Sequence, residues 1–260
     1  MKAMSFLTAV LLPFAAHAAD PTAKIAGIQV IWDDGSKDFE MFKTYNSDKG
    51  TGVTLVVNGG DKQLIGFDSD KAVLKVGGAT AKCHFFSGDA SYSKDHKSLR
   101  LEFSTAGKTQ AESDGTLKIT GDIPVTLASG KEETRSESLT VTTDAEVKFP
   151  AAKPGSSLPT LKVKSSGKPK YGDGVFEIEF STDRRPDDIA GIRFYGKDGK
   201  ELEAHRGSSG WTSFGGHGSG EMTYSFKVPV TDLVVAVENW TGREEVRVKV
   251  DLSAGLAAPK

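Results

Sequence analysis

The residues that could carry out covalent chemistry gather in a glycine-rich stretch of the second half of the chain. Ser219 follows His217 closely and His205 lies upstream, so a serine nucleophile with a histidine base is one interpretation. The Gly-x-Ser-x-Gly elbow is not met, because His217 and Glu221 occupy its two glycine positions around Ser219. A hydrolase that uses the His217/Ser219 loop is therefore kept as an alternative, and the main expectation is that the protein is not an enzyme.

An acidic turn at Asp33–Asp38 offers oxygen ligands at alternate positions. Asp34, Ser36 and Asp38 have the spacing found at the start of a calcium-binding loop. Such a loop needs glycine at its sixth position, and Phe39 stands there instead. We interpret the segment as a polar turn between strands, with a calcium-dependent adhesive module as an alternative, and we expect no metal and no cofactor.

The chain has one cysteine, Cys83. This count excludes an intrachain disulfide framework and any zinc or iron–sulfur site built from several cysteines. In a strand His84 would point to the opposite face from Cys83, so the two would not share a metal ion. Free cysteine is among the most buried residue types, and we expect Cys83 to be a buried structural residue.

The segment from Arg206 to Tyr224 combines aromatic rings with six glycines. An exposed tryptophan there would offer a flat apolar face with one donor, which suits a sugar ring or a pocket on a partner protein. The alternative is a hairpin or bulged edge strand whose Trp211 folds back to cap the core, because large aromatic side chains are mostly buried. The candidate ligand- or partner-binding residues are Trp211, Phe214, His205, Arg206, His217, Trp240 and Tyr195.

Strands must position these residues, because the second half of the chain alternates apolar and polar side chains. Phe176, Ile178 and Phe180 share one face of a predicted strand. Asp198-Gly199 predicts a tight hairpin turn between two further strands. The alternation recurs at 161–164, 222–228, 233–237 and 246–250. About seven short strands at this spacing are typical of an antiparallel sandwich.

This strand spacing resembles that of immunoglobulin-like and fibronectin type III sandwiches. The Cys…Trp…Cys signature of true immunoglobulin domains is absent, because Cys83 has no partner. The first half of the chain alternates in the same way, and no segment has a helical apolar stripe over three turns. The predicted alternating segments of the first half are 28–32, 53–57, 99–103 and 117–127.

A run of two prolines, a glycine and two serines at 151–159 predicts a linker. The sequence thus predicts an all-β protein with two consecutive antiparallel β-sandwich domains. The N-terminal β-sandwich domain spans 20–150, and the C-terminal immunoglobulin-like domain spans 160–254, followed by a tail at 255–260.

Residues 1–19 have the pattern of a cleaved signal peptide. Lys2 gives a positive start, 6–16 is an apolar run, and Ala16-His17-Ala18 is a small-x-small cleavage sequence. The apolar run is shorter than the roughly 20 residues of a membrane span, and no cysteine near the cleavage point supports a lipid anchor. We expect an exported chain, periplasmic or secreted, with no membrane span or lipid anchor.

Composition limits the class of function. The chain has 260 residues, 37% of them hydrophobic, and a formal net charge of −2. These values are ordinary for a globular protein and exclude a nucleic-acid binder driven by bulk basic charge. The predicted function is a non-enzymatic binding or structural module of the periplasm or cell surface, with a protein or carbohydrate partner and an oligomeric state left open.

Overall fold

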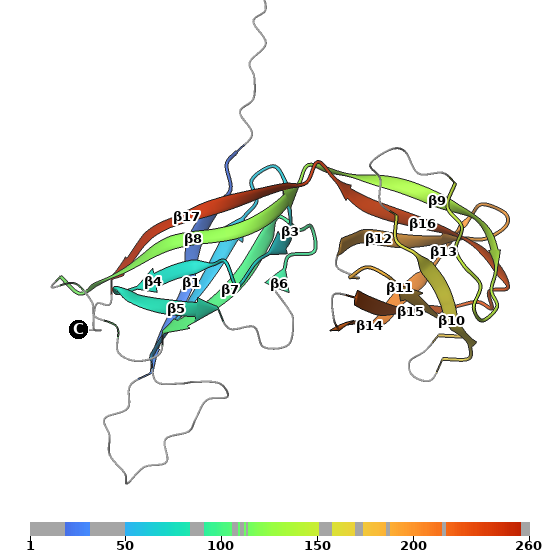
Figure 1. Cartoon of the computed structure of the whole chain (residues 1–260), viewed down its shortest axis with the longest axis horizontal. Coiled ribbons are helices and arrows are strands. Elements are labelled where there is room, and N and C mark those ends of the chain that lie inside the picture. The colour runs from blue at the N-terminus through green and yellow to red at the C-terminus, as the bar shows by residue number, and fades with distance from the viewer. Residues whose placement is uncertain are drawn as a thin grey trace, which may run out of the picture.

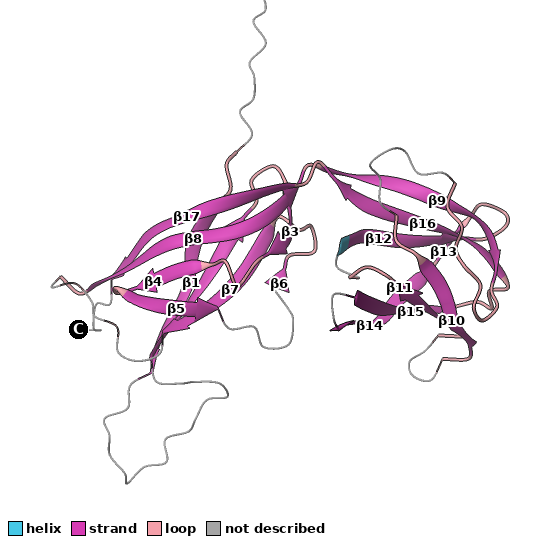
Figure 2. Cartoon of the chain, viewed as in Figure 1, coloured by secondary structure: helices cyan, strands magenta, loops and turns pink. Residues whose placement is uncertain are grey.

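The structure, a computed structural model, describes residues 19–31, 50–83, 91–105, 109, 112, 114–150, 158–169, 174–185, 188–214 and 217–255. In this part of the chain strands dominate and no α-helix occurs; the short piece drawn as helix beside β12 in Figure 2 is a 3₁₀ turn at Asp188. Every strand pair is antiparallel. The prediction of an all-β, antiparallel protein is confirmed.

One nine-stranded sheet forms the first lobe. Its main strands lie in the order β1 (Thr22–Ile31), β2 (Gly50–Asn58), β7 (Ser98–Thr105), β5 (Ala79–Cys83), β4 (Val73–Val76), β8 (Thr116–Ala128) and β17 (Glu244–Gly255). β3 (Gln63–Phe67) pairs with β8, and β6 (Ser91–Tyr92) pairs with β7. The end strands β1 and β17 come close to each other, so the sheet curls nearly into a barrel. This differs from the two stacked sheets expected for residues 20–150, because alternation shows which side chains face inward but not whether a sheet curls on itself.

The inward side chains fill the curled sheet with a single apolar core. In β2 the residues Val53, Leu55 and Val57 are buried, and the residues between them are half-exposed. Phe103 of β7 and Ile119 of β8 meet them in the same core. The period-two pattern in the sequence therefore reports real inside and outside faces.

The second lobe has two four-stranded sheets that pack against each other. The first, called the β14 sheet, has the order β10 (Leu161–Gly167), β11 (Phe176–Thr182), β15 (His217–Phe226) and β14 (Ala204–Phe214). The second, called the β16 sheet, has the order β13 (Glu201–Leu202), β12 (Ile189–Tyr195), β16 (Asp232–Thr241) and β9 (Gly130–Thr140). Residues of both sheets form one core, as in a β-sandwich.

Aromatic rings dominate the centre of this second core. The ring of Phe194, from the β16 sheet, has its centroid 4.8 Å from that of Tyr224 and 5.1 Å from that of Phe226, both in the β14 sheet. The ring of Phe180 stacks on Phe194 at 5.9 Å. Because these contacts cross from one sheet to the other, they hold the two layers together.

A two-stranded ribbon runs through both lobes (Figure 1). β8 continues into β9 at Ser129, and β16 continues into β17 through Gly242 and Arg243. The amide of Ser129 donates to the carbonyl of Thr241 at 3.1 Å, and Gly242 has a φ of 58°, which favours glycine.

The two cores do not divide at residues 151–159. The second core uses residues from 139 to 237, whereas β17, at the end of the chain, completes the first sheet. The second lobe is thus inserted between β8 and β17. A Pro/Gly/Ser run marks where alternation stops, but it carries no information on which core the flanking strands join.

Candidate interaction surface

β14 is the outer edge of its sheet. It pairs with β15 on one side, and within the described chain no strand pairs with its other side. The residues from His205 to Gly210 are exposed, as is Thr212. An edge strand of this kind presents a row of backbone donors and acceptors to any extended chain that approaches.

The chemistry of this edge is unusual for an exposed strand. Proteins commonly protect sheet edges with charged residues, proline or bulges. In β14 a bulge between Arg206 and Ser209 interrupts the pairing, but Ser209–Phe214 then continues in regular register with β15. These six residues, which we call the β14 edge, contain no charge and no proline. By contrast β17, an end strand of the first sheet, carries charged residues such as Lys249 and Asp251.

Trp211 lies in the middle of the β14 edge and covers the glycines of the neighbouring strand. It pairs with Gly220, and a Cβ on Gly220 would be 3.1 Å from the indole. A Cβ on Gly218 would overlap the indole ring itself. The ring is half-buried, and its Nε1 is buried without a hydrogen-bond partner. Trp211 therefore lies against the backbone of two glycines at the end of the inner face of the sheet. This position resembles the alternative interpretation, in which Trp211 folds back onto the core.

The other predicted binding residues of this segment lie on the same hairpin. His205 and Arg206 are exposed on β14, on the far side of the bulge. Phe214 and His217 form the last backbone pair of the hairpin, and their side chains lie outside the described part. The glycine-rich segment is a β-hairpin with a bulge, which is the alternative given for it above, and the indole of Trp211 covers the space above Gly218 and Gly220 of β15.

Tyr195 and Trp240 do not join this surface. They are only 7% and 5% exposed and lie on β12 and β16, in the opposite layer of the sandwich. The guanidinium of Arg135 lies 4.1 Å above the Tyr195 ring, and Nζ of Lys131 lies 4.6 Å above the Trp240 ring. Both aromatic rings are here covered by long cationic side chains of β9, which is next to the strand of Trp240 and one strand further from that of Tyr195, an arrangement that spacing alone does not predict.

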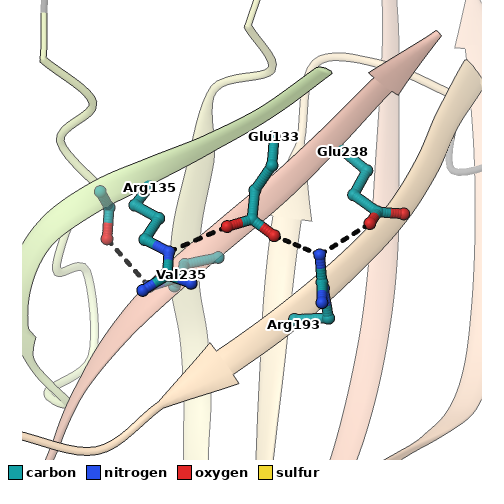
Figure 3. Close-up of polar contacts among 6 residues, drawn as sticks. Glu133, Arg135, Arg193, Val235 and Glu238 are labelled. Atoms are coloured by element: carbon teal, nitrogen blue, oxygen red, sulfur yellow. Dashed lines mark hydrogen bonds and ion pairs between the residues drawn. The ribbon is translucent and has the colours of Figure 1, made fainter. Parts of the chain in front are cut away.

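Sequence reasoning missed a charged network on the outer face of the β16 sheet (Figure 3). Glu133 accepts from Nε of Arg135 at 2.9 Å and also pairs with Arg193. Arg193 in turn donates to Glu238 at 2.9 Å. The alternation of Glu133 and Arg135 was a signal for an outward face, but their partners come from strands far away in the sequence. Each carboxylate faces a guanidinium, so the network supplies no free acid or base.

The pairing of Ser219 with His205, one form of the hydrolase alternative, is not formed, and the side chain of His217 lies outside the described part. His205 lies opposite Ser225, whereas Ser219 lies six residues earlier on the same strand, opposite Thr212. At roughly 3.3 Å per residue this separation is about 20 Å. His205 therefore cannot remove a proton from Ser219.

The remaining candidates are the acidic turn and the single cysteine. Asp34, Ser36 and Asp38 lie outside the described residues, and among those described no group of three His, Cys, Asp or Glu side chains could hold a metal ion. Cys83 is half-buried against the first core rather than fully buried, and burial raises the pKa of its thiol to about 12. A thiol with so high a pKa is a poor nucleophile near neutral pH.

Two further findings concern the chain as a whole. None of the described residues form a helix of the length and apolar character that crossing a membrane requires. Comparison of the sequence and structure with protein-family models, with curated proteins and with solved structures found no match.

Proposed function

We propose that this protein is an exported, non-enzymatic binding module that takes an extended segment of a partner protein onto the β14 edge. One observation carries the proposal: Ser209–Phe214 is a regular, uncharged and proline-free strand whose outer side has no pairing strand among the described residues. Strand addition to such an edge uses backbone hydrogen bonds for affinity and alternate side chains for specificity.

The surroundings of the β14 edge favour close approach of a second backbone. The position where Gly210 would carry a Cβ has no atom within 4 Å, so the outer face of the β14 edge is open there and leaves room for side chains of a docked strand on that face. Trp211 on the inner face gives an inward-facing residue of the docked strand a large apolar neighbour. Burying one such side chain contributes about 1.5–3 kcal/mol, so the backbone bonds and the indole together are needed for useful affinity.

The strand order supports an immunoglobulin-like second domain. The order β10-β11-β15-β14 corresponds to strands A-B-E-D of that architecture, and β13-β12-β16-β9 corresponds to C′-C-F-G. The position of strand G is occupied by β9, which precedes β10 in the chain, because β17, the strand that follows β16, pairs with β8 in the first sheet. A sandwich of this kind is a rigid frame for a binding edge, although a fold alone does not define function.

Export to the periplasm or outside the cell is part of the proposal. Its support is the signal-peptide pattern of residues 1–19, with Ala16-His17-Ala18 before the expected cleavage point. An exported module that carries one cysteine and little net charge is suited to recognition rather than to redox or nucleic-acid chemistry.

A displayed library of random decapeptides, screened on the full mature chain, tests the proposal. We expect enriched peptides that lack central proline and lose binding when alternate backbone nitrogens are methylated, because strand addition needs those donors. Ser209→Lys places a charge on the inner face of the edge, where a docked strand would bury it, and should weaken binding at least about tenfold. Thr212→Lys adds the same charge on the outer face and is the matched control.

Both lysine variants are first checked for an unchanged urea midpoint. Binding that survives methylation of the peptide, or that responds equally to both lysines, would refute strand addition at this edge. Selective capture of oligosaccharides by the wild-type chain and not by Trp211→Ala would instead support a carbohydrate partner. Turnover of an ester or peptide substrate would refute the non-enzymatic assignment.

A further inference from the structure

The beginning of the described chain is bonded to a turn of the first lobe. The backbone nitrogen of Ala19 donates to Oδ2 of Asp61 at 3.1 Å. Asp61 lies in the turn between β2 and β3, and β1 begins three residues after Ala19, with Thr22 paired to Asn58. Residue 19 therefore lies beside the end of the strand to which β1 is paired.

The turn is shaped around residue 19. Gly60 has a φ of 65°, and a Cβ at this position would overlap the carbonyl oxygen of Ala19. Oδ1 of Asn58 accepts from the Gly60 amide at 2.8 Å, and the ammonium of Lys97 bonds the Asp61 carbonyl. Other groups thus hold the turn backbone, while the Asp61 carboxylate is bonded to Ala19.

The sequence places a processing signal directly before this contact. Ala16-His17-Ala18 has small residues at the two positions that a signal peptidase reads, so the scissile bond is the one between Ala18 and Ala19. This bond lies one residue before the end of the segment 1–19 that the sequence pattern marks as the signal peptide, and Ala19 becomes the first residue of the mature chain. Hydrolysis consumes one water: the hydroxyl goes to the carbonyl of Ala18, which leaves as a carboxylate, and the nitrogen of Ala19 becomes an ammonium. The atom that gains the charge is the one that contacts Asp61.

We propose that Asp61 is the binding site for the new N-terminus, an α-ammonium produced on Ala19 by signal peptidase cleavage. The proposal rests on the export that forms part of the proposed function, and it is independent of the β14 edge. Before cleavage the neutral amide of Ala19 donates to the Asp61 carboxylate, and after cleavage the donor also carries a positive charge, so cleavage adds an attraction between opposite charges to the existing hydrogen bond.

The pairing ties down an end of the first sheet that would otherwise fray. Ala19, Asp20 and Pro21 line a groove of about 390 Å³ together with Glu244 and other residues at the start of β17. Strand β1 is an end of the sheet, and the first residues of a domain are poorly ordered unless they are anchored. The mature chain is therefore more stable than a chain that carries any extension before Ala19.

The test begins with the exported protein, whose N-terminus is read by intact mass and Edman sequencing. We expect it to begin at Ala19. Four proteins are then compared: the chain beginning at Ala19 and the same chain with Gly-Ser added in front, each with Asp61 or with Asp61→Asn. Asp61→Asn should lower Tm by about 1–3 °C in the chain that begins at Ala19 and clearly less in the extended chain.

Asp20→Asn is the matched control, since it removes a neighbouring exposed carboxylate and should shift Tm equally in both backgrounds. The difference due to Asp61 should also shrink in about 1 M salt, where exposed charges are screened. A chain that is not cleaved, or is cleaved elsewhere, overturns both this inference and the proposed export. Cleavage at Ala19 with an equal effect of Asp61→Asn in both backgrounds overturns only the role of Asp61.

Discussion

The indole of Trp211 rests on Gly218, with no room for a side chain between ring and backbone. The two residues lie on adjacent strands of one hairpin, and Gly220, the register partner of Trp211 two residues further along β15, makes the same kind of contact. This contact fixes the position of the aromatic ring on the β14 edge. Glycine at 218 is thus a packing requirement rather than a sign of a flexible loop.

Gly218→Ala should displace the Trp211 ring and destabilise the second lobe by about 1–3 kcal/mol, the usual effect of overpacking. Urea unfolding measures the free energy, and near-ultraviolet circular dichroism reports the tryptophan environment. Gly210→Ala is the matched control on the adjacent strand, because no atom lies within 4 Å of its Cβ position, and it should change stability by less than about 1 kcal/mol. Equal stability of the two variants would contradict the packing role of Gly218.

Arg193→Gln should destabilise the protein modestly, because it leaves Glu133 and Glu238 without the guanidinium between them. The side chain of Arg193 is 41% exposed, so we expect a loss of only about 1 kcal/mol. The loss should shrink in about 1 M salt, where the Debye length falls to about 3 Å. Arg100→Gln, which removes one exposed pair with Glu102, is the control and should have a smaller effect. A loss that does not depend on salt would point instead to packing of the Arg193 side chain against Ala236, its register partner on β16.

Asp232→Asn should make stability less dependent on pH at the acid end. The hydroxyl of Thr140 and the ammonium of Lys197 hold the pKa of the Asp232 carboxyl below its usual 3.8. A lowered pKa means that this group stabilises the fold above pH 3.8 and that the contribution is lost as the pH falls through the folded-state pKa. Urea midpoints should therefore differ between wild type and variant near neutral pH and converge at about pH 2–3. Asp251→Asn, at an exposed site, is the control. A difference in urea midpoint between wild type and Asp232→Asn that grows as the pH falls would contradict the stabilising role of the ionised Asp232 carboxylate.

Cys83 should react slowly with iodoacetamide in the native protein. Burial and the nearby Glu102 raise its thiol pKa to about 12, so only about one thiol in ten thousand is ionised near pH 8. Intact mass measured over time, with and without urea, gives the two rates. We expect unfolded protein to be labelled at least about a hundredfold faster. Native labelling at the unfolded rate would show that the first core is open at Cys83.

Alternation predicted the strands whose two faces differ in polarity. The apolar face of β11 at Phe176, Ile178 and Phe180 and the hairpin turn at Asp198-Gly199 are both confirmed: Gly199 has a φ of 78°, and the turn joins β12 to β13. These features depend on local chemistry, which a sequence displays directly.

Apolar–polar alternation did not predict strands β9 and β14. β9 is almost wholly polar, because it is the end strand of its sheet and its outward positions carry Glu133 and Arg135. β14 lacks alternation because glycines and serines replace its apolar residues. The partners of both strands, and the course of β17 back to the first lobe, are set by long-range pairing that no window of sequence contains.

The insertion of the second lobe between β8 and β17 sets an order of assembly. The strands of the second lobe, β9 to β16, are contiguous in the chain, so this lobe can complete itself while the C-terminal residues are still emerging. The first sheet cannot be completed before β17, the last of the described strands, has been synthesised. Until then β8 has no partner at the positions that pair with β17. We therefore expect the second lobe to fold before the first, although its residues are synthesised later. β16, the last strand of the second lobe, then leads directly into β17, which pairs with β8 and completes the first sheet.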